Sequence, residues 1–385
     1  MKKKINIAQV GSGFFGKIHA EGWALLPILL PDVAAIPVRK VLCDITEERA
    51  SKAANDYGFE EYCVGVDELL KRDDIDIVDI CTPSGTHQEV YISCLKSGKF
   101  KFVFAEKPLA NTLEGAKEIY KVSKEVNCPT GIGFNKRHWP AVAYTKELLD
   151  EGYIGKPIFY RGKYFQSFNL GSDKRASETK RIKGSGMDES ACHIVDLARY
   201  FFGDIEDIVG MHQTFYKETL SRPLKEGEEL SDIPKVPRDL EDTTAFMGHT
   251  KEGMMASFEF SSVFSGEYEG VGYEIFGEKG AIRWYGQRAM ELEVQSQLDS
   301  EGVQGFRTVF LGKPGHPYSN GMPALPGFGV GVNSCMAFQF YDVVNAYIQN
   351  KPYKPDFEDG LKAAQVMEAV RISEKERKWV KIDEL

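Results

Sequence analysis

Two hydrophobic patterns divide the 385-residue chain, and the first extends from residue 4 to about residue 134. Short runs of strand-forming residues recur there and predict β-strands at 4–10, 38–44, 75–81, 101–106 and 129–135, with a weaker strand near Tyr62. Residues with helical spacing predict helices between them, at 46–57, 66–72, 85–97 and 112–126. Strands that are apolar throughout and alternate with helices indicate a parallel sheet covered on both faces.

The pattern changes after about residue 140. A helix is expected over 139–152, an extended segment over 156–168 and a second helix over 186–203. Runs that alternate with a period of two then follow at 206–216, 243–249, 253–264, 269–277 and 280–286. Because turns that contain glycine link these runs, we expect one large mixed or antiparallel sheet.

Two segments of the second half break this regularity. Residues 220–242 are rich in Pro, Glu, Lys and Asp and are expected to form a surface insertion or a mobile loop. Residues 311–331 combine many Gly and Pro residues with aromatic ones, which predicts an ordered loop in a pocket wall. Helices are expected after it, at about 334–350 and 358–376.

A chain of this length exceeds the size at which one hydrophobic core keeps growing, so we expect two domains. The protein is predicted to be α/β, with residues 1–134 forming a doubly wound parallel domain. Residues 135–385 are predicted to form a second α/β domain with a large, mainly antiparallel open sheet. Its last helices can pack back on the first domain.

Composition and charge narrow the class of binding partner. The chain is 42% hydrophobic and 27% charged, which is typical of a globular protein, and no apolar stretch is long enough to span a membrane. Its formal net charge of -9 disfavours nucleic acids and anionic membranes, so a small molecule is the expected partner.

The N-terminal MKKKINIAQVG is typical of a strand, not of a secretion signal. Seven scattered cysteines favour reduced thiols and a cytoplasmic location.

The stretch VGSGFFG places Gly11, Gly13 and Gly16 in the G-x-G-x-x-G spacing directly after the first strand. The first glycine permits a tight turn, the second lets the backbone approach a pyrophosphate, and the third lets a helix pack close to the strand. The helix N-terminus then faces the negative charge. This context predicts a Rossmann domain that binds a dinucleotide at the loop, with Phe14 and Phe15 among the contacts.

Asp44 ends the second predicted strand. A carboxylate there can accept hydrogen bonds from an adenosine ribose and would repel a 2′-phosphate, which favours NAD over NADP. A structural role as N-cap of the helix at 46–57 is the alternative, and one residue can serve both.

Two polar segments follow later strands, CTPSGTHQEV at 81–90 and AEKPLA at 105–110. Because ligands bind at the carboxyl ends of parallel strands, residues of both segments are expected to line the crevice: Thr82, Pro83, His87, Glu106, Lys107 and Pro108. A partly buried Lys107 beside a cofactor can orient a substrate hydroxyl or relay its proton. A solvated surface lysine is the structural alternative.

The helix at 186–203 carries acids and a histidine in an otherwise apolar run. Glu189 and His193 lie four apart and share one face, where a carboxylate and an imidazole can pass protons or hold a metal. A buried, hydrogen-bonded histidine beside a helix-capping acid is the structural alternative, and this segment alone favours it. Cys192 is turned roughly 100° from His193 and is expected to belong to the core.

Taken in order, these motifs resemble the glucose-fructose oxidoreductase, inositol dehydrogenase and MocA family over nearly the whole chain. The resemblance implies a Rossmann domain, an α/β domain whose open sheet commonly serves oligomer contacts, and hydride exchange between a nicotinamide and a carbon of a sugar or cyclitol. A homo-oligomer, dimer or tetramer, is therefore expected. Carried over by position, the family's catalytic residues are Lys107, Glu189 and His193.

The helix departs from the family pattern Asp-x-Gly-x-His, because this chain has ESACH. Glu189 replaces the Asp and Ala191 replaces the Gly. The extra methylene moves the carboxylate by about 1.5 Å, a displacement that can matter in catalysis. Asp188 is a second candidate for the acid, although its offset of five from His193 directs it to a different helix face.

Three further stretches are similar to a levoglucosan-dehydrogenase-like branch, whose members oxidise a sugar at a ring carbon, including C3. They are the crossover ending in PVRKV, the HPY loop and the tail PDFEDGLKAAQVMEAV. We therefore expect NAD-dependent oxidation of a ring carbinol in a sugar, anhydrosugar, glycoside or cyclitol. His193 would accept the hydroxyl proton, Lys107 would hydrogen-bond the developing alkoxide, and Glu189 would orient its partners.

Other polar residues are expected to contact the substrate hydroxyls: Asn135, Arg137, Tyr164, Gln166 and His316. Two rivals use the same dinucleotide, a sensor without turnover and a glycosidase or lyase that begins with the same oxidation. A metal-dependent hydrolase using Glu189, His193 and Asp196 is a third rival, but it lacks a further strong ligand and no metal is expected.

Overall fold

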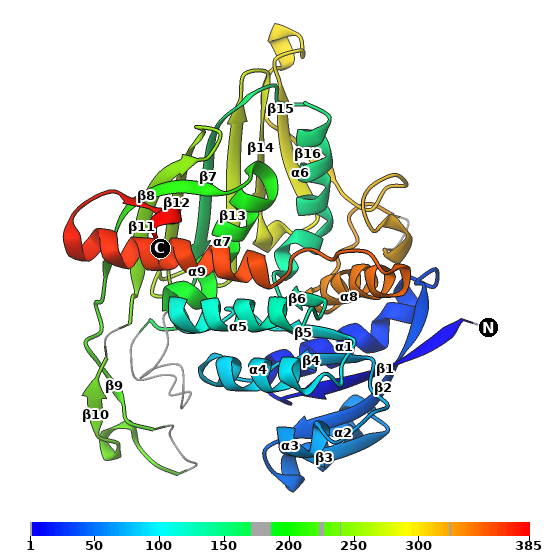
Figure 1. Cartoon of the computed structure of the whole chain (residues 1–385). Helices are drawn as coiled ribbons and strands as arrows, with labels where there is room; N and C mark the ends of the chain where they lie inside the picture. The colour runs from blue at the N-terminus through cyan, green and yellow to red at the C-terminus, as the bar shows by residue number, and fades with distance from the viewer. Residues whose placement is uncertain (1, 171–185, 223–226, 239, 323–324) are drawn as a thin grey trace. The chain divides into compact units, whose positions relative to one another are not determined.

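A six-stranded parallel sheet organises the first part of the molecule. The computed structural model describes residues 2–170, 186–222, 227–238, 240–322 and 325–385 (Figure 1). The sheet has the order β3-β2-β1-β4-β5-β6. Its strands are β1 (Lys3–Val10), β2 (Ala35–Asp44), β3 (Glu61–Val64), β4 (Ile77–Ile80), β5 (Phe102–Ala105) and β6 (Thr130–Ile132). The strand order reverses between β1 and β4, which creates the switch point where doubly wound sheets bind ligands.

The predicted strands, including the one near Tyr62, are confirmed. The helices of this part are α1 (Phe14–Leu29), α2 (Glu47–Tyr57), α3 (Val66–Leu69), α4 (His87–Ser97), α5 (Leu113–Glu125) and α8 (Val332–Gln349). Helices α4 and α5 lie side by side in Figure 1, and α1 packs against α8. A Cβ on Gly22 of α1 would lie 2.8 Å from the Met336 side chain, so α1 and α8 approach closely at this glycine.

Residues 1–140 and 312–361 form the first compact unit, and residues 141–311 and 362–385 form the second. The segment 312–361 therefore belongs with the parallel sheet, although the sequence pattern suggested a single boundary at residue 134 with a return of the last helices. The expected insertion at 220–242 lies partly outside the described residues; its described part contains β10 (Lys235–Pro237), which pairs with β9 (Glu218–Leu220), the strand that ends where the insertion begins.

The second unit is built on one nine-stranded sheet of order β16-β15-β14-β13-β7-β12-β11-β8-β17. All its pairings are antiparallel except β7 with β12, which confirms the mainly antiparallel prediction. The strands are β7 (Pro157–Phe165), β8 (Ile205–Gln213), β11 (Thr243–Thr250), β12 (Met255–Ser261), β13 (Gly270–Gly277), β14 (Gly280–Tyr285), β15 (Glu291–Ser296), β16 (Arg307–Phe310) and β17 (Val380–Lys381).

Helix α7 (Gly186–Phe202) packs on one face of this sheet, against β7 and β12. A Cβ on Gly162 of β7 would lie 3.0 Å from the Ile194 side chain, and the Tyr160 hydroxyl donates to the Ile194 carbonyl at 3.0 Å. Gly162 and Tyr160 thus determine how closely α7 approaches β7. The remaining helices are α6 (Pro140–Asp150) and α9 (Phe357–Glu376).

The opposite face of the sheet carries exposed apolar side chains. Met247 of β11 is paired across the ladder with Val209 of β8 and Ser257 of β12, so these three side chains share a face. Met211 and Met255 are exposed on the same face, and Met247 itself is 47% exposed. No described helix is both long and apolar enough to cross a membrane. All seven cysteines are free thiols, as predicted.

Candidate active site

The glycine loop between β1 and α1 has two positions that only glycine fits. Gly11 adopts φ +98°, and a Cβ there would lie 2.8 Å from the Cys81 carbonyl oxygen. A Cβ on Gly16 would lie 2.4 Å from the Gly11 carbonyl oxygen. The Gln9 side chain donates to the Gly11 and Gly16 carbonyls at 3.0 and 2.8 Å, so one side chain of β1 holds both ends of the loop. Gly13 differs, because no heavy atom lies within 4 Å of its Cβ position.

The open position at Gly13 lies at the N-terminus of α1. No side chain caps this end, and the first turn of α1 has no acidic residue. The amide groups of a helix N-terminus attract an anion, and the missing Cβ leaves room for one to approach the backbone. The neighbouring Phe14 is 77% exposed. These residues fit the pyrophosphate of a dinucleotide.

Asp44 reaches the glycine loop from the end of β2. Its Oδ2 accepts from the Ser12 amide at 3.0 Å and from the Ser12 hydroxyl at 2.6 Å, and its Oδ1 accepts from the Ile45 amide at 2.7 Å. Arg49 Nε lies 3.2 Å from Oδ1. The N-cap of α2 is Thr46, whose side chain accepts from the Arg49 amide, so the alternative assignment of Asp44 as N-cap is wrong.

Side chains from α4 clamp the segment that follows β5. The Tyr91 hydroxyl donates to the Glu106 carbonyl at 2.7 Å. The ring nitrogens of His87 lie 2.7 Å from the Pro108 carbonyl and 2.9 Å from the Thr82 carbonyl, so this ring joins the segments after β4 and β5. Within the described structure the buried Thr82 hydroxyl oxygen has no hydrogen-bond partner. Predicted residues from the two motifs are therefore held together at the switch point.

Lys107 is a buried cation, with only 8% of its surface exposed. Its Nζ lies 5.4 Å from the centroid of the Phe15 ring in α1, within range of a cation–π interaction. The alternative of a solvated surface lysine is wrong. Burial keeps the ammonium close to the glycine loop, where it can act on a bound molecule.

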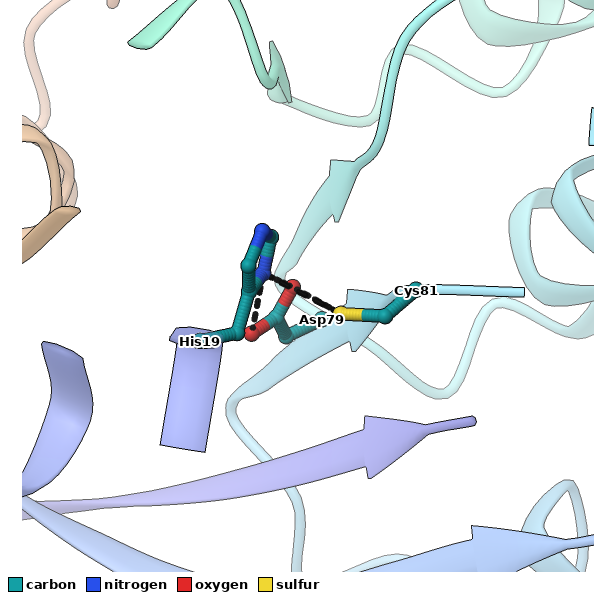
Figure 2. Close-up of side chains that lie close together, drawn as sticks. All are labelled: His19, Asp79 and Cys81. Atoms are coloured by element: carbon teal, nitrogen blue, oxygen red, sulfur yellow. Dashed lines mark hydrogen bonds and ion pairs between the residues drawn. The ribbon is translucent and has the colours of Figure 1, made fainter. Parts of the chain in front are cut away.

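A group of buried polar residues joins the predicted Glu106 to His19 and Asp79, two residues that the sequence motifs did not indicate. His19 Nδ1 is 2.9 Å from Asp79 Oδ1, and His19 Nε2 is 2.9 Å from Glu106 Oε1. Figure 2 shows His19, Asp79 and Cys81 pointing toward one another, with the Cys81 sulfur 3.1 Å from Nδ1. Two signals could have identified the pair: an aspartate inside the fully buried strand β4, and a histidine one turn after Gly16.

The second unit places His193 on the buried face of α7, where it is 4% exposed. The His193 and Tyr164 ring centroids lie 6.0 Å apart. The Tyr164 hydroxyl donates to Glu269 at 2.7 Å, the Gln166 amide donates to Glu269 at 3.3 Å, and the Ser190 hydroxyl donates to Gln166 at 3.2 Å. Three predicted residues thus gather with Ser190 and Glu269, which the motifs did not indicate.

Burial raises the pKa of Tyr164 well above its usual value, and the neighbouring Glu269 carboxylate raises it further. The phenol therefore stays protonated and donates to the carboxylate at neutral pH. Glu269 becomes a fixed acceptor that orients both Tyr164 and Gln166. This arrangement presents hydrogen-bonding groups beside His193 without adding a mobile charge.

Asp188 serves a structural ion pair at the start of α7. Arg371 of α9 bonds Asp188, and its Nε lies 3.1 Å from Glu241 and its Nη1 3.4 Å from Glu368. Burial would lower the pKa of Arg371, but the charges of Asp188 and Glu241 outweigh that effect and raise it. Asp188 is committed to this cation, which leaves the half-buried Glu189 as the candidate acid near His193.

The remaining predicted contacts lie in the first unit. Arg137 donates to Asp359 at 3.1 Å, and both side chains are 8% exposed, so Arg137 has a buried structural partner. The buried Asn135 carbonyl oxygen Oδ1 has no partner in the described structure. Burial and the nearby Lys313 lower the pKa of His316. Contact of these residues with a substrate remains a prediction.

The metal ligands considered from the sequence do not come together as a group. Among the described residues, the side chains whose ligand atoms lie within 4.8 Å of one another are His19, Asp79 and Cys81. The set of Glu189, His193 and Asp196 is not such a group. The hydrolase alternative therefore has no preformed ligand set on α7.

Comparison with known families and structures identifies this arrangement. Residues 5–134 match the model of the oxidoreductase family with an NAD-binding Rossmann fold, and residues 142–283 match the GFO/IDH/MocA C-terminal domain. The chain belongs to the GFO/IDH/MocA oxidoreductase family. This confirms the family resemblance found in the sequence, and with it an NAD-binding Rossmann domain.

The relatives of this GFO/IDH/MocA protein include sugar and cyclitol dehydrogenases. It is 32% identical to levoglucosan dehydrogenase of Pseudarthrobacter phenanthrenivorans over 100% of this chain and 99% of that protein. It is 33% identical to the NAD⁺-dependent scyllo-inositol 2-dehydrogenase of Bacillus subtilis over 53% of this chain and 55% of that protein. The solved structure of levoglucosan dehydrogenase in complex with NADH and levoglucosan matches with a TM-score of 0.91, at 32% identity, over 99% of this chain and 100% of that one.

Replacing Arg371 with methionine should lower the free energy of unfolding by about 3 kcal/mol, because the substitution leaves the buried Asp188 and Glu241 carboxylates without their shared cation. Chemical denaturation measures this loss. Arg377→Met removes an exposed arginine and is the matched control, with an expected change of under about 0.5 kcal/mol. An Arg371→Met protein as stable as the control would contradict the anchoring role.

Proposed function

We propose that this protein is an NAD-dependent dehydrogenase that moves hydride between the nicotinamide and a ring carbinol carbon of a cyclic sugar. The substrate class comprises sugars, 1,6-anhydrosugars and glycosides, with cyclitols as the second candidate. One observation carries the proposal: full-length similarity to a protein whose solved structure holds NADH and levoglucosan. The similarity to an inositol dehydrogenase over about half the chain supports the cyclitol candidate.

The chain supplies two kinds of group for this reaction. The bound dinucleotide would supply the hydride acceptor. Lys107 is a buried ammonium that can stabilise negative charge developing on a substrate oxygen. His193 is a buried imidazole that can accept the hydroxyl proton. We propose that both act on the same substrate hydroxyl.

Glu189 takes the place of the family's aspartate in this proposal. Asp188, the neighbouring acid, is bound by Arg371 and is therefore assigned no catalytic role. Tyr164 and Gln166 are proposed to orient substrate hydroxyls, because Glu269 holds both of them close to His193. Asn135, whose buried oxygen is available as an acceptor, is proposed as a further contact. Arg137 and His316 are proposed as further contacts of the same kind.

NADH formation should be detectable when the purified protein is given NAD and a panel of 1,6-anhydrosugars, aldoses, glucosides and inositols. Lys107→Ala and His193→Ala should each lower kcat by about 100-fold or more, because each removes a group that acts in the transition state. Lys121→Ala changes an exposed lysine of α5 and is the control. Glu189→Asp should keep activity, whereas Glu189→Gln should lose it.

The outcomes of this assay separate the proposed function from its rivals. Turnover that survives both Lys107→Ala and His193→Ala would contradict the assigned roles. Tight NADH binding without turnover on the whole panel would favour a sensor. A cleaved aglycone among the products would favour a glycosidase or lyase that begins with the same oxidation.

Asp44 is proposed to favour NAD over NADP, because its carboxylate would repel a 2′-phosphate. Asp44→Ser should weaken NADH binding and tighten NADPH binding, each by about tenfold. NADH and NADPH fluorescence titrations measure both constants and need no substrate. Asp56→Asn removes an exposed carboxylate of α2 and should change neither constant. Unchanged NADPH affinity in Asp44→Ser would count against the assignment.

A homo-oligomer is also proposed, with the exposed face of the nine-stranded sheet as its contact. Exposed methionines on that face can be covered by a second copy. Sedimentation should give two or four times the chain mass, and Met247→Glu should shift the distribution toward the monomer, because it buries a charge in an apolar contact. A monomeric wild-type protein would refute the proposal.

A further inference from the structure

We propose that His19 is a positioning residue for the dehydrogenase reaction: its bond to Glu106 fixes the backbone and side chain that present Lys107. The inference rests on the proposed role of Lys107. It concerns a residue that lies one turn after the glycine loop and is fully buried. His19 is therefore argued to act through Glu106, without touching the substrate.

The contacts of His19 join three elements of the first unit. From α1, its Nδ1 donates to Asp79 of β4 at 2.9 Å and its Nε2 donates to Glu106, directly after β5, at 2.9 Å. Asp79 is held in turn by Trp23 Nε1, which donates to its Oδ2 at 2.7 Å. The Cys81 thiol completes the group, 3.5 Å from Asp79 Oδ1 (Figure 2). We call these five residues the His19 network.

Both carboxylates of the His19 network need a cation. Carboxylates only accept hydrogen bonds, so a ring that donates to both of them carries two protons and a positive charge. Burial alone would lower the pKa of His19, but the charge of Asp79 raises it well above its usual value. Burial would raise the pKa of Glu106, but His19 outweighs it and holds the value low, with help from Lys107. Two buried cations therefore face two buried carboxylates.

Apolar rings isolate the His19 network from water. The Trp23 and Phe340 rings are stacked, with their centroids 3.7 Å apart. The centroid of the His19 ring lies 5.5 Å from that of Phe340 and 5.9 Å from that of Phe104. Charges separated from water in this way interact strongly, and a missing partner is costly. The network should therefore have one arrangement, with little freedom at Glu106.

Glu106 transmits this constraint to Lys107 because its amide, its carbonyl and its carboxylate oxygen Oε1 are all hydrogen-bonded. Its amide donates to the Ile80 carbonyl at 2.9 Å, and its carbonyl accepts from Tyr91 at 2.7 Å. Its side chain lies against Gly133, where a Cβ would be only 2.4 Å from Oε1. His19 supplies the bond that holds the carboxylate end. Without that bond the buried carboxylate would lose its His19 partner, and it would then be drawn toward Lys107, whose charge already helps to lower the pKa of Glu106.

The two amide variants of His19 separate its two bonds. In Asn, the amide nitrogen occupies the position of Nδ1, so His19→Asn keeps the bond to Asp79 and loses the one to Glu106. In Gln, the amide nitrogen occupies the position of Nε2, so His19→Gln keeps the bond to Glu106. Both variants remove the same charge. Any difference between them therefore reports the Glu106 bond.

The experiment compares kcat, KM and thermal unfolding of the wild type, His19→Asn, His19→Gln and the control Trp284→Phe. The expected result is a kcat at least about tenfold lower in His19→Asn than in His19→Gln, with KM for the substrate changed by less than about threefold. Trp284→Phe removes the hydrogen bond of a buried tryptophan to the Ala289 carbonyl in the second unit, outside the His19 network, and is the stability control: its melting temperature should fall while its kcat stays near wild type. Equal kcat in the two His19 variants, or a kcat that follows melting temperature across all variants, would overturn the proposal.

Crystal structures of the two His19 variants test the inference without turnover. The Glu106 carboxylate should move away from its wild-type position in His19→Asn and stay in place in His19→Gln. If the wild type oxidises no sugar or cyclitol, the proposed function fails while this comparison still decides the positioning role. A stoichiometric zinc ion in the purified protein, lost on Cys81→Ser, would also overturn the proposal, because His19 would then be a metal ligand and not a donor to Asp79.

Discussion

The doubly bonded His19 is the constraint on which the first unit depends. It lies on α1, and its partners come from β4 and from the segment after β5, so one side chain fixes the helix over the carboxyl ends of two central strands. Gly16 precedes His19 by about one helical turn, and its missing side chain lets the start of the helix lie against the glycine loop, because a Cβ there would be 2.4 Å from the Gly11 carbonyl oxygen. The first turns of α1 are therefore positioned twice: by close packing at Gly16 and by the buried charged bonds of His19.

The second unit positions its chemistry by close packing together with one ion pair. Gly162 lets α7 settle onto β7, and Tyr160 bonds the helix backbone at the same point. Arg371 then holds the N-terminal end of α7 through Asp188. The middle and the beginning of the helix are therefore fixed independently, and His193 lies between these two anchors.

Sequence patterns predicted those features that depend on neighbours in the chain. Strand periods and glycine spacing gave the sheets and the dinucleotide loop, because both are local. The N-cap assignment of Asp44 failed since its carboxylate bonds Ser12, which is 32 residues away. His19 and Asp79 are 60 residues apart, so no spacing rule joins them, although an aspartate within a buried strand always needs a partner. Contacts of this kind become visible only when the strand order is known.

The way the chain is shared between the two units has a consequence for how it folds during synthesis. The first unit needs residues 312–361, which leave the ribosome only after almost the whole nine-stranded sheet has been made. Until then the surface of α1 that α8 covers stays exposed, and the Ile132 carbonyl lacks its bond from Gln339. The nucleotide-binding unit, although its six strands are encoded first, is therefore among the last parts to be completed, and for most of translation its helix α1 lacks the cover of α8.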